Sequence, residues 1–101
     1  EIDALVTPQL PITAPAIVDG MVRINGREEP VPVALTRYTR IFNLTGLPSL
    51  SVCCGFSRDG LPIGLQITAR PFDETTALRI GHVYQRQARI GHRQPDLRVH
   101  E

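Results

Sequence analysis

The side chains with the greatest potential for chemistry include two adjacent cysteines. Cys53 and Cys54 lie inside an apolar run, whereas a nucleophilic thiol needs a basic or helix-N-terminal environment to form the thiolate. We therefore interpret both as buried, unreactive cysteines. Neighbouring cysteines cannot form an unstrained disulfide, so the pair also favours a reducing, cytoplasmic setting.

The histidines do not have the spacing of a metal site. His82 and His92 fall on different faces of one predicted helix, and His100 lies in a polar tail. A serine–histidine–aspartate triad could be assembled from one of the serines, but no Gly-x-Ser-x-Gly segment supports it. We therefore assign no metal, no cofactor and no catalytic residue to this sequence.

The basic residues exclude a further mechanism. All 11 side chains counted as lysine or arginine are arginines. Arginine keeps its proton in proteins and cannot act as a general base. Any reaction that needs a lysine base must take it from residues outside this sequence.

Composition limits the class of protein. A chain of 101 residues with 42% hydrophobic residues has the size and composition of one small globular domain. Its formal net charge of +1 provides no concentrated positive field for nucleic acid or an anionic membrane. No apolar run reaches the length of a membrane-spanning helix, and the start has no signal-peptide pattern.

Two apolar runs predict the central strands, at residues 49–56 and 63–69, with a turn at residues 58–60 between them. Neither run alternates cleanly between apolar and polar residues, which is typical of strands covered on both faces. Covering both faces requires helices above and below the sheet. The sequence therefore needs more helical cover than one small domain usually supplies.

Other segments predict a third strand and a hairpin. Residues 4–6 form a short apolar run that ends at a proline, as a buried strand leaving a sheet would. The Asn-Gly dipeptide at residues 25–26, between residues 21–24 and 28–33, is a strong hairpin signal. We expect this hairpin to be peripheral because one of its sides is polar.

Two helices follow from apolar spacing. The first is predicted over residues 36–44 and stopped by Gly46 and Pro48. The second begins after Asp73, the predicted N-cap. It carries opposite apolar and basic stripes, which are Ala77, Ile80, Gly81, Tyr84 and Ala88 against Arg79, His82, Arg86, Arg89 and Arg93. One long and one short helix cannot cover both faces of the predicted strands, so we expect a fragment of a larger α/β sheet.

Four segments, in order and spacing, resemble the C-terminal region of the amidase signature family. They are DALVTP at 3–8, FNLTGLPSLSVCCGF at 42–56, GLPIGLQ at 60–66 and PFDE at 71–74. The resemblance implies an α/β/α fold with a mixed sheet, of which residues 1–101 would form the C-terminal part of a single domain. It also implies amide hydrolysis by a serine nucleophile, a second serine and a lysine base, all upstream of this chain.

The resemblance further implies which residues face the acyl pocket. They are Val33, Thr36 and Arg40 at the first helix and Phe72 before the last one. In the glutamine-hydrolysing subunit of tRNA-dependent amidotransferases, an aspartate that holds the substrate ammonium would occupy the position of Thr36. Threonine cannot form that ion pair, so a general amidase is favoured. A second departure is Cys53, where family members usually have proline.

Three expectations therefore stand. The favoured one is an amidase fragment, inactive alone, whose partners are a small amide substrate and the missing N-terminal part of the fold. Such a fragment should also associate with itself to cover its bare sheet. A free-standing, non-catalytic α/β binding module and a fragment of the A subunit of a glutamine amidotransferase remain as alternatives.

Overall fold

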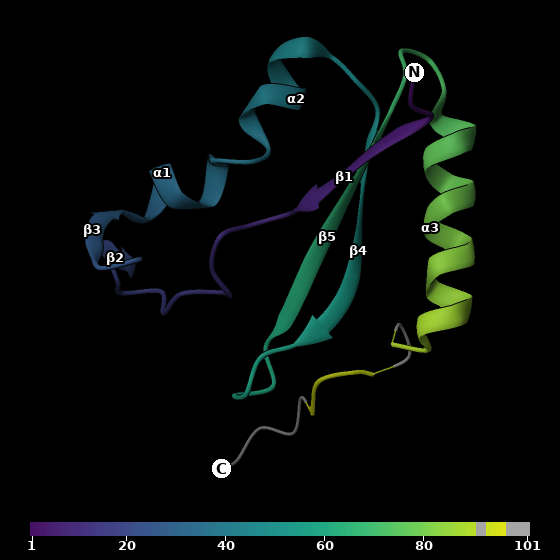
Figure 1. Cartoon of the computed structure of the whole chain (residues 1–101). Helices are drawn as coiled ribbons and strands as arrows, with labels where there is room; N and C mark the ends of the chain where they lie inside the picture. The colour runs from purple at the N-terminus through teal and green to yellow at the C-terminus, as the bar shows by residue number, and fades with distance from the viewer. Residues whose placement is uncertain (91–92, 97–101) are drawn as a thin grey trace.

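The computed structural model describes residues 1–90 and 93–96, so His92 and His100 lie outside the described residues. In chain order the elements are β1 (Ala4–Pro8), β2 (Met21–Ile24), β3 (Arg27–Pro30), α1 (Val31–Thr36), α2 (Arg40–Thr45), β4 (Ser49–Phe56), β5 (Pro62–Ala69) and α3 (Glu74–Ala88) (Figure 1). The mixture of strands and helices confirms the predicted α/β class.

A three-stranded sheet forms the centre, in the order β1-β5-β4. Both neighbours of β5 run antiparallel to it. The outer backbone edges of β1 and β4 have no further strand partner within the described part of the chain. The predicted hairpin is present as the separate β2–β3 pair.

The long helix α3 packs on one face of the sheet. Its N-cap is Asp73, as predicted, and the Asp73 carboxylate accepts hydrogen bonds from the backbone N–H (3.4 Å) and hydroxyl (2.7 Å) of Thr76. The buried helix residues Ala77 and Gly81 belong to the predicted apolar stripe. They meet a small core whose sheet members are Val52, Ile67 and Ala69, flanked by Leu50 and Leu65.

The structure corrects the predicted boundaries before β4. The second hairpin strand ends at Pro30, and residues 31–33 begin α1 instead of continuing the strand. Proline near the start of a helix explains this, since Pro32 lacks only an N–H that would be unpaired there. The helix predicted over residues 36–44 is divided by a turn at residues 37–39, and α2 ends at Gly46 in the left-handed conformation.

The second face of the sheet is covered in part by the segment that contains α1 and α2, which lies opposite α3 (Figure 1). Residues 66–69 of β5 are consequently buried on both sides. The edge strand β1 is not, because Leu5 and Val6 remain 45% and 52% exposed on its two faces. The expected two-sided cover is therefore present for β5 and incomplete at the edge of the sheet.

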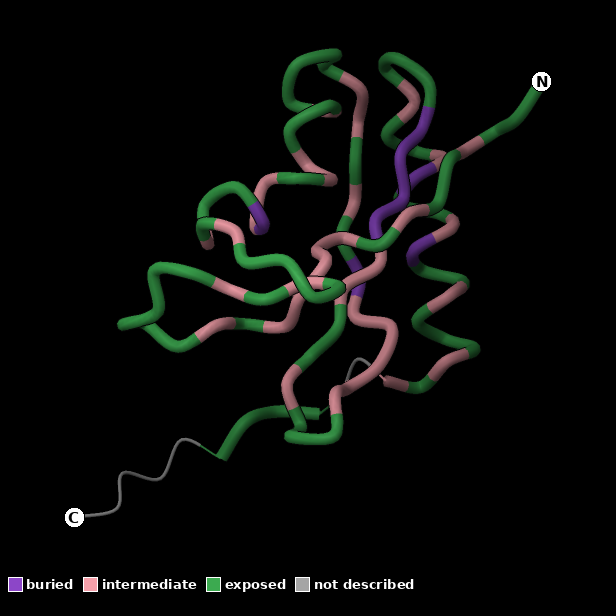
Figure 2. Tube along the Cα trace, turned by 60° about the vertical axis from the view of Figure 1, so that its left-hand side comes forward, coloured by how far each residue is buried: buried purple, intermediate pink, exposed green. Residues whose placement is uncertain are grey.

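Little of the chain is buried as a whole (Figure 2). Ile67 is the only large side chain that is fully buried among the described residues. The accessible surface is 8107 Å², whereas a compact monomer of this mass exposes about 5,700 Å². The radius of gyration is 15.6 Å, against about 13 Å for a compact domain of this length.

Two further sequence interpretations can be compared with the structure. Cys53 and Cys54 are free thiols but only half-buried, so their description as buried was wrong. The β4–β5 pairing shifts register between Cys53 and Gly55, so Cys54 has no partner in the ladder. None of the helices at residues 1–90 and 93–96 has the length and hydrophobicity that crossing a bilayer requires.

Candidate functional site

Polar side chains from all three strands gather on the sheet face that is turned away from α3. Successive side chains of a strand point to opposite faces, and Leu50, Val52 and Ile67 point toward α3. Their neighbours in the strands therefore point the other way. These neighbours are Ser49 and Ser51 of β4 and Gln66 and Thr68 of β5. Thr7 of β1 shares their face because it pairs with Gln66.

Gln66 joins this polar face to the segment between α1 and α2. Its side-chain Nε2 donates to Thr7 Oγ1 (3.2 Å) and to the carbonyl oxygen of Tyr38 (3.1 Å). Ser49 Oγ and Thr68 Oγ1 form a further hydrogen bond of 2.8 Å on the same face. Because Gln66 is only 3% exposed, loss of its partners would leave a buried amide unpaired. This role of Gln66 was not predicted, although a glutamine inside an apolar strand was an available signal.

The structure brings together two of the predicted substrate-binding residues. The Thr36 hydroxyl donates to the carbonyl oxygen of Pro32 (2.8 Å). The same hydroxyl accepts a hydrogen bond from Arg40 Nη2 (2.8 Å). Val33 lies on α1 in the turn before Thr36 and is 46% exposed. Residues 33, 36 and 40 thus follow one segment at the surface.

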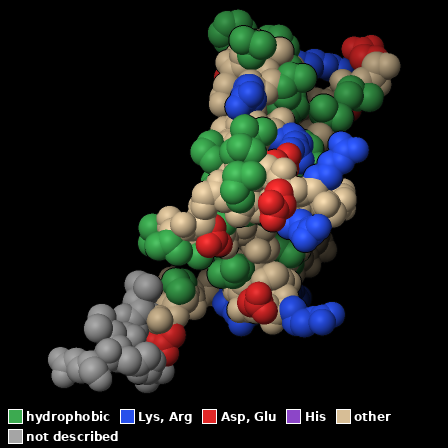
Figure 3. Space-filling view, turned by 90° about the vertical axis from the view of Figure 1, so that its left-hand side faces the viewer, with side chains coloured by type: hydrophobic (Ala, Val, Ile, Leu, Met, Phe, Trp, Pro, Cys, Tyr) green, Lys and Arg blue, Asp and Glu red, His purple; other side chains and the backbone are tan. Residues whose placement is uncertain are grey.

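An ion pair attaches this segment to the β2–β3 hairpin. Arg37 pairs with Glu29 of β3, and the backbone N–H of Val31 donates to the carbonyl oxygen of Gly20 (3.0 Å). The hairpin is therefore joined to α1, and it lies apart from the three-stranded sheet, as predicted (Figure 1). The face that carries these elements shows hydrophobic side chains mixed with charges of both signs (Figure 3).

Phe72, the fourth predicted residue, lies apart from the other three. It sits in the loop between β5 and α3, which is beside α3 and away from α1 (Figure 1). Its side chain is 94% exposed, and its backbone is in the left-handed region with φ 60°. A bulky residue adopts this conformation at an energetic cost. The loop is closed by a hydrogen bond from Asp73 N–H to the Arg70 carbonyl (3.0 Å).

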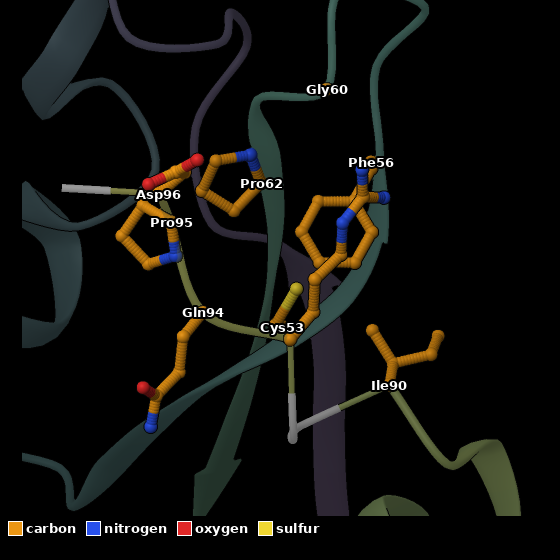
Figure 4. Close-up of a pocket in the computed structure, with 9 residues that line it drawn as sticks. Cys53, Phe56, Gly60, Pro62, Ile90, Gln94, Pro95 and Asp96 are labelled. Atoms are coloured by element: carbon orange, nitrogen blue, oxygen red, sulfur yellow. The ribbon is translucent and has the colours of Figure 1, made fainter. Parts of the chain in front are cut away.

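Two cavities lie at opposite ends of the sheet. One, of about 300 Å³, is bounded by the start of β1, the residues before β4 and the β5–α3 loop, with Leu5, Phe42, Leu47 and Pro71 among its lining. The other, of about 490 Å³, includes Cys53, Phe56 and Arg93 (Figure 4). The Arg93 guanidinium there lies 4.7 Å from the centre of the Phe56 ring. The four predicted substrate-binding residues line neither cavity.

The serines do not form a triad with the histidine that the structure describes. Ser49 and Ser51 lie on the sheet face away from α3, whereas His82 is exposed on α3 itself. Ser57 Oγ accepts the backbone N–H of Leu61 (3.1 Å) in the β4–β5 turn. The Ser49 and Ser57 hydroxyls stabilise the sheet and its turn, and no general base contacts any of the three serines within residues 1–90 and 93–96.

Comparison with known proteins gives consistent matches. The chain is 41% identical over 95 residues to the A subunit of glutamyl-tRNA(Gln) amidotransferase from Brevibacillus brevis, a match that covers 93% of this chain and 18% of the relative. It is 40% identical over 97 residues to an amidase of Pseudomonas putida, covering 95% of this chain and 21% of that enzyme. The solved structure of 6-aminohexanoate cyclic dimer hydrolase matches with a TM-score of 0.81 and 28% identity, over 94% of this chain and 21% of that one.

The matches therefore cover nearly all of this chain, while the chain spans about a fifth of the length of these relatives. The family model described as Amidase matches residues 1–78. The four segments that suggested the resemblance all lie within that range, and they fall on β1, α2, β4, β5 and the loop that leads into α3. This chain belongs to the Amidase family.

Proposed function

We propose that this chain is the C-terminal part of a single amidase domain that hydrolyses carboxylic amides to an acid and ammonia or an amine. A serine nucleophile, a second serine and a lysine base would come from residues outside the chain, and the chain alone would be inactive. The observation that carries the proposal is the Amidase match over residues 1–78 together with a sequence that contains no lysine. The lysine base would have to be neutral, which requires a buried site that lowers its pKa. Because this sequence contains no lysine, the base would come from the rest of the protein.

The exposed surface supports the need for a larger partner. Side chains such as Leu5, Ile41, Leu44 and Phe72 are large, apolar and exposed. The excess surface relative to a compact monomer is about 2,400 Å², which is of the size that a stable interface buries. In the proposed enzyme the remaining part of the same fold would cover these residues.

The role proposed for the chain is to shape the acyl pocket. Val33, Thr36 and Arg40 would contribute one wall, and Phe72 would contribute from the β5–α3 loop. The Gln66 contacts support this role because they hold the α1–α2 segment against the sheet. We also place the enzyme in a reducing, cytoplasmic setting, which is supported by the free thiols of Cys53 and Cys54.

The A subunit of a glutamine amidotransferase is the second candidate, because relatives with that name match nearly the whole chain. The local geometry favours the general amidase. The Thr36 hydroxyl is already shared between Pro32 and Arg40, and neither group can balance the charge of a substrate ammonium.

The proposal is tested by assaying the isolated chain and the complete protein against a panel of aliphatic and aryl amides. The complete protein should release acid and ammonia or amine, whereas the isolated chain should stay at the rate of buffer. Turnover by the isolated chain that survives repurification, and that disappears in Ser49→Ala, Ser51→Ala or Ser57→Ala, would contradict the proposal.

A further inference from the structure

Among residues 1–90 and 93–96, no carboxylate pairs with Arg40. Arg37, three residues earlier, is paired with Glu29, and Arg70 is paired with Glu1 and Asp3 (3.3 Å each). Within the described ranges, the hydrogen bond of Arg40 is to the neutral Thr36 hydroxyl (2.8 Å), and it has no salt bridge. The α1–α2 segment therefore presents one net positive charge at this point.

The Thr36 contact also fixes the guanidinium. Arg40 lies four residues after Thr36, across the turn at residues 37–39, and only its Nη2 group is used by the contact. Thr36 is itself held by its bond to Pro32 (2.8 Å). Most of the guanidinium N–H donors remain available in a planar arrangement that suits the two oxygens of a carboxylate.

We propose that Arg40 is a specificity-determining residue that binds a carboxylate on the acyl chain of the substrate. This inference rests on the proposed function, in which the α1–α2 segment faces the acyl pocket. The preferred substrates would then be monoamides of short dicarboxylic acids. Substrates with an ammonium group at the same place would be disfavoured by like-charge repulsion.

The test compares two amides of equal chain length in the complete protein. Succinamate carries a terminal carboxylate, and butyramide carries a methyl group in its place. We expect a higher kcat/KM for succinamate than for butyramide, and we expect Arg40→Gln to lower the ratio of the two values about tenfold to a hundredfold. Arg79→Gln is the matched control, because it removes the same charge from the exposed face of α3 and should leave both values unchanged.

The outcomes separate the two proposals. Equal loss of both activities in Arg40→Gln, or no loss of either, overturns the role of Arg40 while amide hydrolysis itself stands. If the complete protein cleaves no amide, the proposed function fails, and succinamate binding measured by calorimetry then decides the inference. Binding that is lost in Arg40→Gln and kept in Arg79→Gln supports the carboxylate site, whereas no binding or equal binding overturns it.

Discussion

Thr36 and Arg40 share a hydrogen bond, so a change at one position alters the charge available at the other. An aspartate placed at position 36 would lie where the Thr36 hydroxyl contacts Arg40 (2.8 Å) and would pair with that arginine. A glutaminase-like change therefore needs both positions. This dependence cannot be seen in the sequence, which shows the spacing of the two residues but not their contact.

We predict that Thr36→Asp alone gives a small gain in glutamine use and that Thr36→Asp combined with Arg40→Gln gives a larger one. In the double variant, the aspartate at position 36 has no arginine to pair with, so its carboxylate can hold the glutamine ammonium. Such a contact contributes about 1.5–3 kcal/mol, or roughly tenfold to a hundredfold in selectivity. The measurement is the kcat/KM ratio of glutamine to butyramide in the complete protein and its three variants. If the double variant leaves the ratio unmoved, Thr36 does not face the pocket.

Phe72 combines an exposed aromatic ring with a left-handed backbone. We predict that, in the complete protein, Phe72→Gly is more stable than Phe72→Ala by about 1 kcal/mol, because glycine adopts positive φ freely. Both variants remove the ring, so their difference isolates the backbone term. Denaturant unfolding measures it, and equal midpoints with equal slopes would show that the backbone at residue 72 stores no strain.

At the scale of elements, local signals were sufficient for β1, β4, β5 and α3. Asp73 was identified as an N-cap because a cap depends on residues within one turn of it. The division between α1 and α2 was not predicted. It involves Tyr38, whose carbonyl accepts a hydrogen bond from Gln66 in a strand 28 residues later, and a local apolar pattern contains no information about such a partner.

The same limit applies to the candidate site. The positions of Val33, Thr36 and Arg40 on one segment could be predicted from their spacing and the family resemblance. The polar network of Gln66 could not, because it depends on the pairing of β1 with β5. That pairing brings together residues that lie 59 positions apart in the chain, such as Thr7 and Gln66, and leaves no trace in nearby sequence.

Gly81 allows α3 to approach β4 closely. A Cβ atom at this position would lie 2.4 Å from Leu50 Cδ2. We predict that Gly81→Ala destabilises the complete protein by about 1–2 kcal/mol, because overpacking costs about 1–3 kcal/mol and helix propensity returns at most about 1 kcal/mol.

The space can be restored at the other side of the contact. Leu50→Val removes the atom that would clash, so the Gly81→Ala and Leu50→Val double variant should be more stable than the sum of the single changes predicts. Thermal unfolding of the four proteins gives this coupling. Additive effects would mean that the contact with Leu50 Cδ2 is not the cause of the loss in Gly81→Ala.

For the whole molecule, the exposed apolar residues predict the behaviour of the isolated chain. We expect it to form dimers or larger assemblies and to bind a hydrophobic dye, since a specific interface buries about 800 Å² per partner and the exposed residues of β1, α1 and α2 can supply that area. Light scattering and dye fluorescence over a concentration series provide the measurement. A monomer that binds no dye at high concentration would count against it.

The pairing of β1 with β5 also sets the order in which the chain can assemble during synthesis. Ala4 pairs with Ala69, and Pro8 pairs with Leu65, so β1 leaves the ribosome long before its partner. At ordinary rates of synthesis the delay is roughly 3–12 s. Closing so long a loop costs about 2 kcal/mol more than closing the short β4–β5 turn. The β4–β5 pair should therefore form first, and Leu5 and Val6 remain available to chaperones, or to the wrong partner, until β5 has emerged.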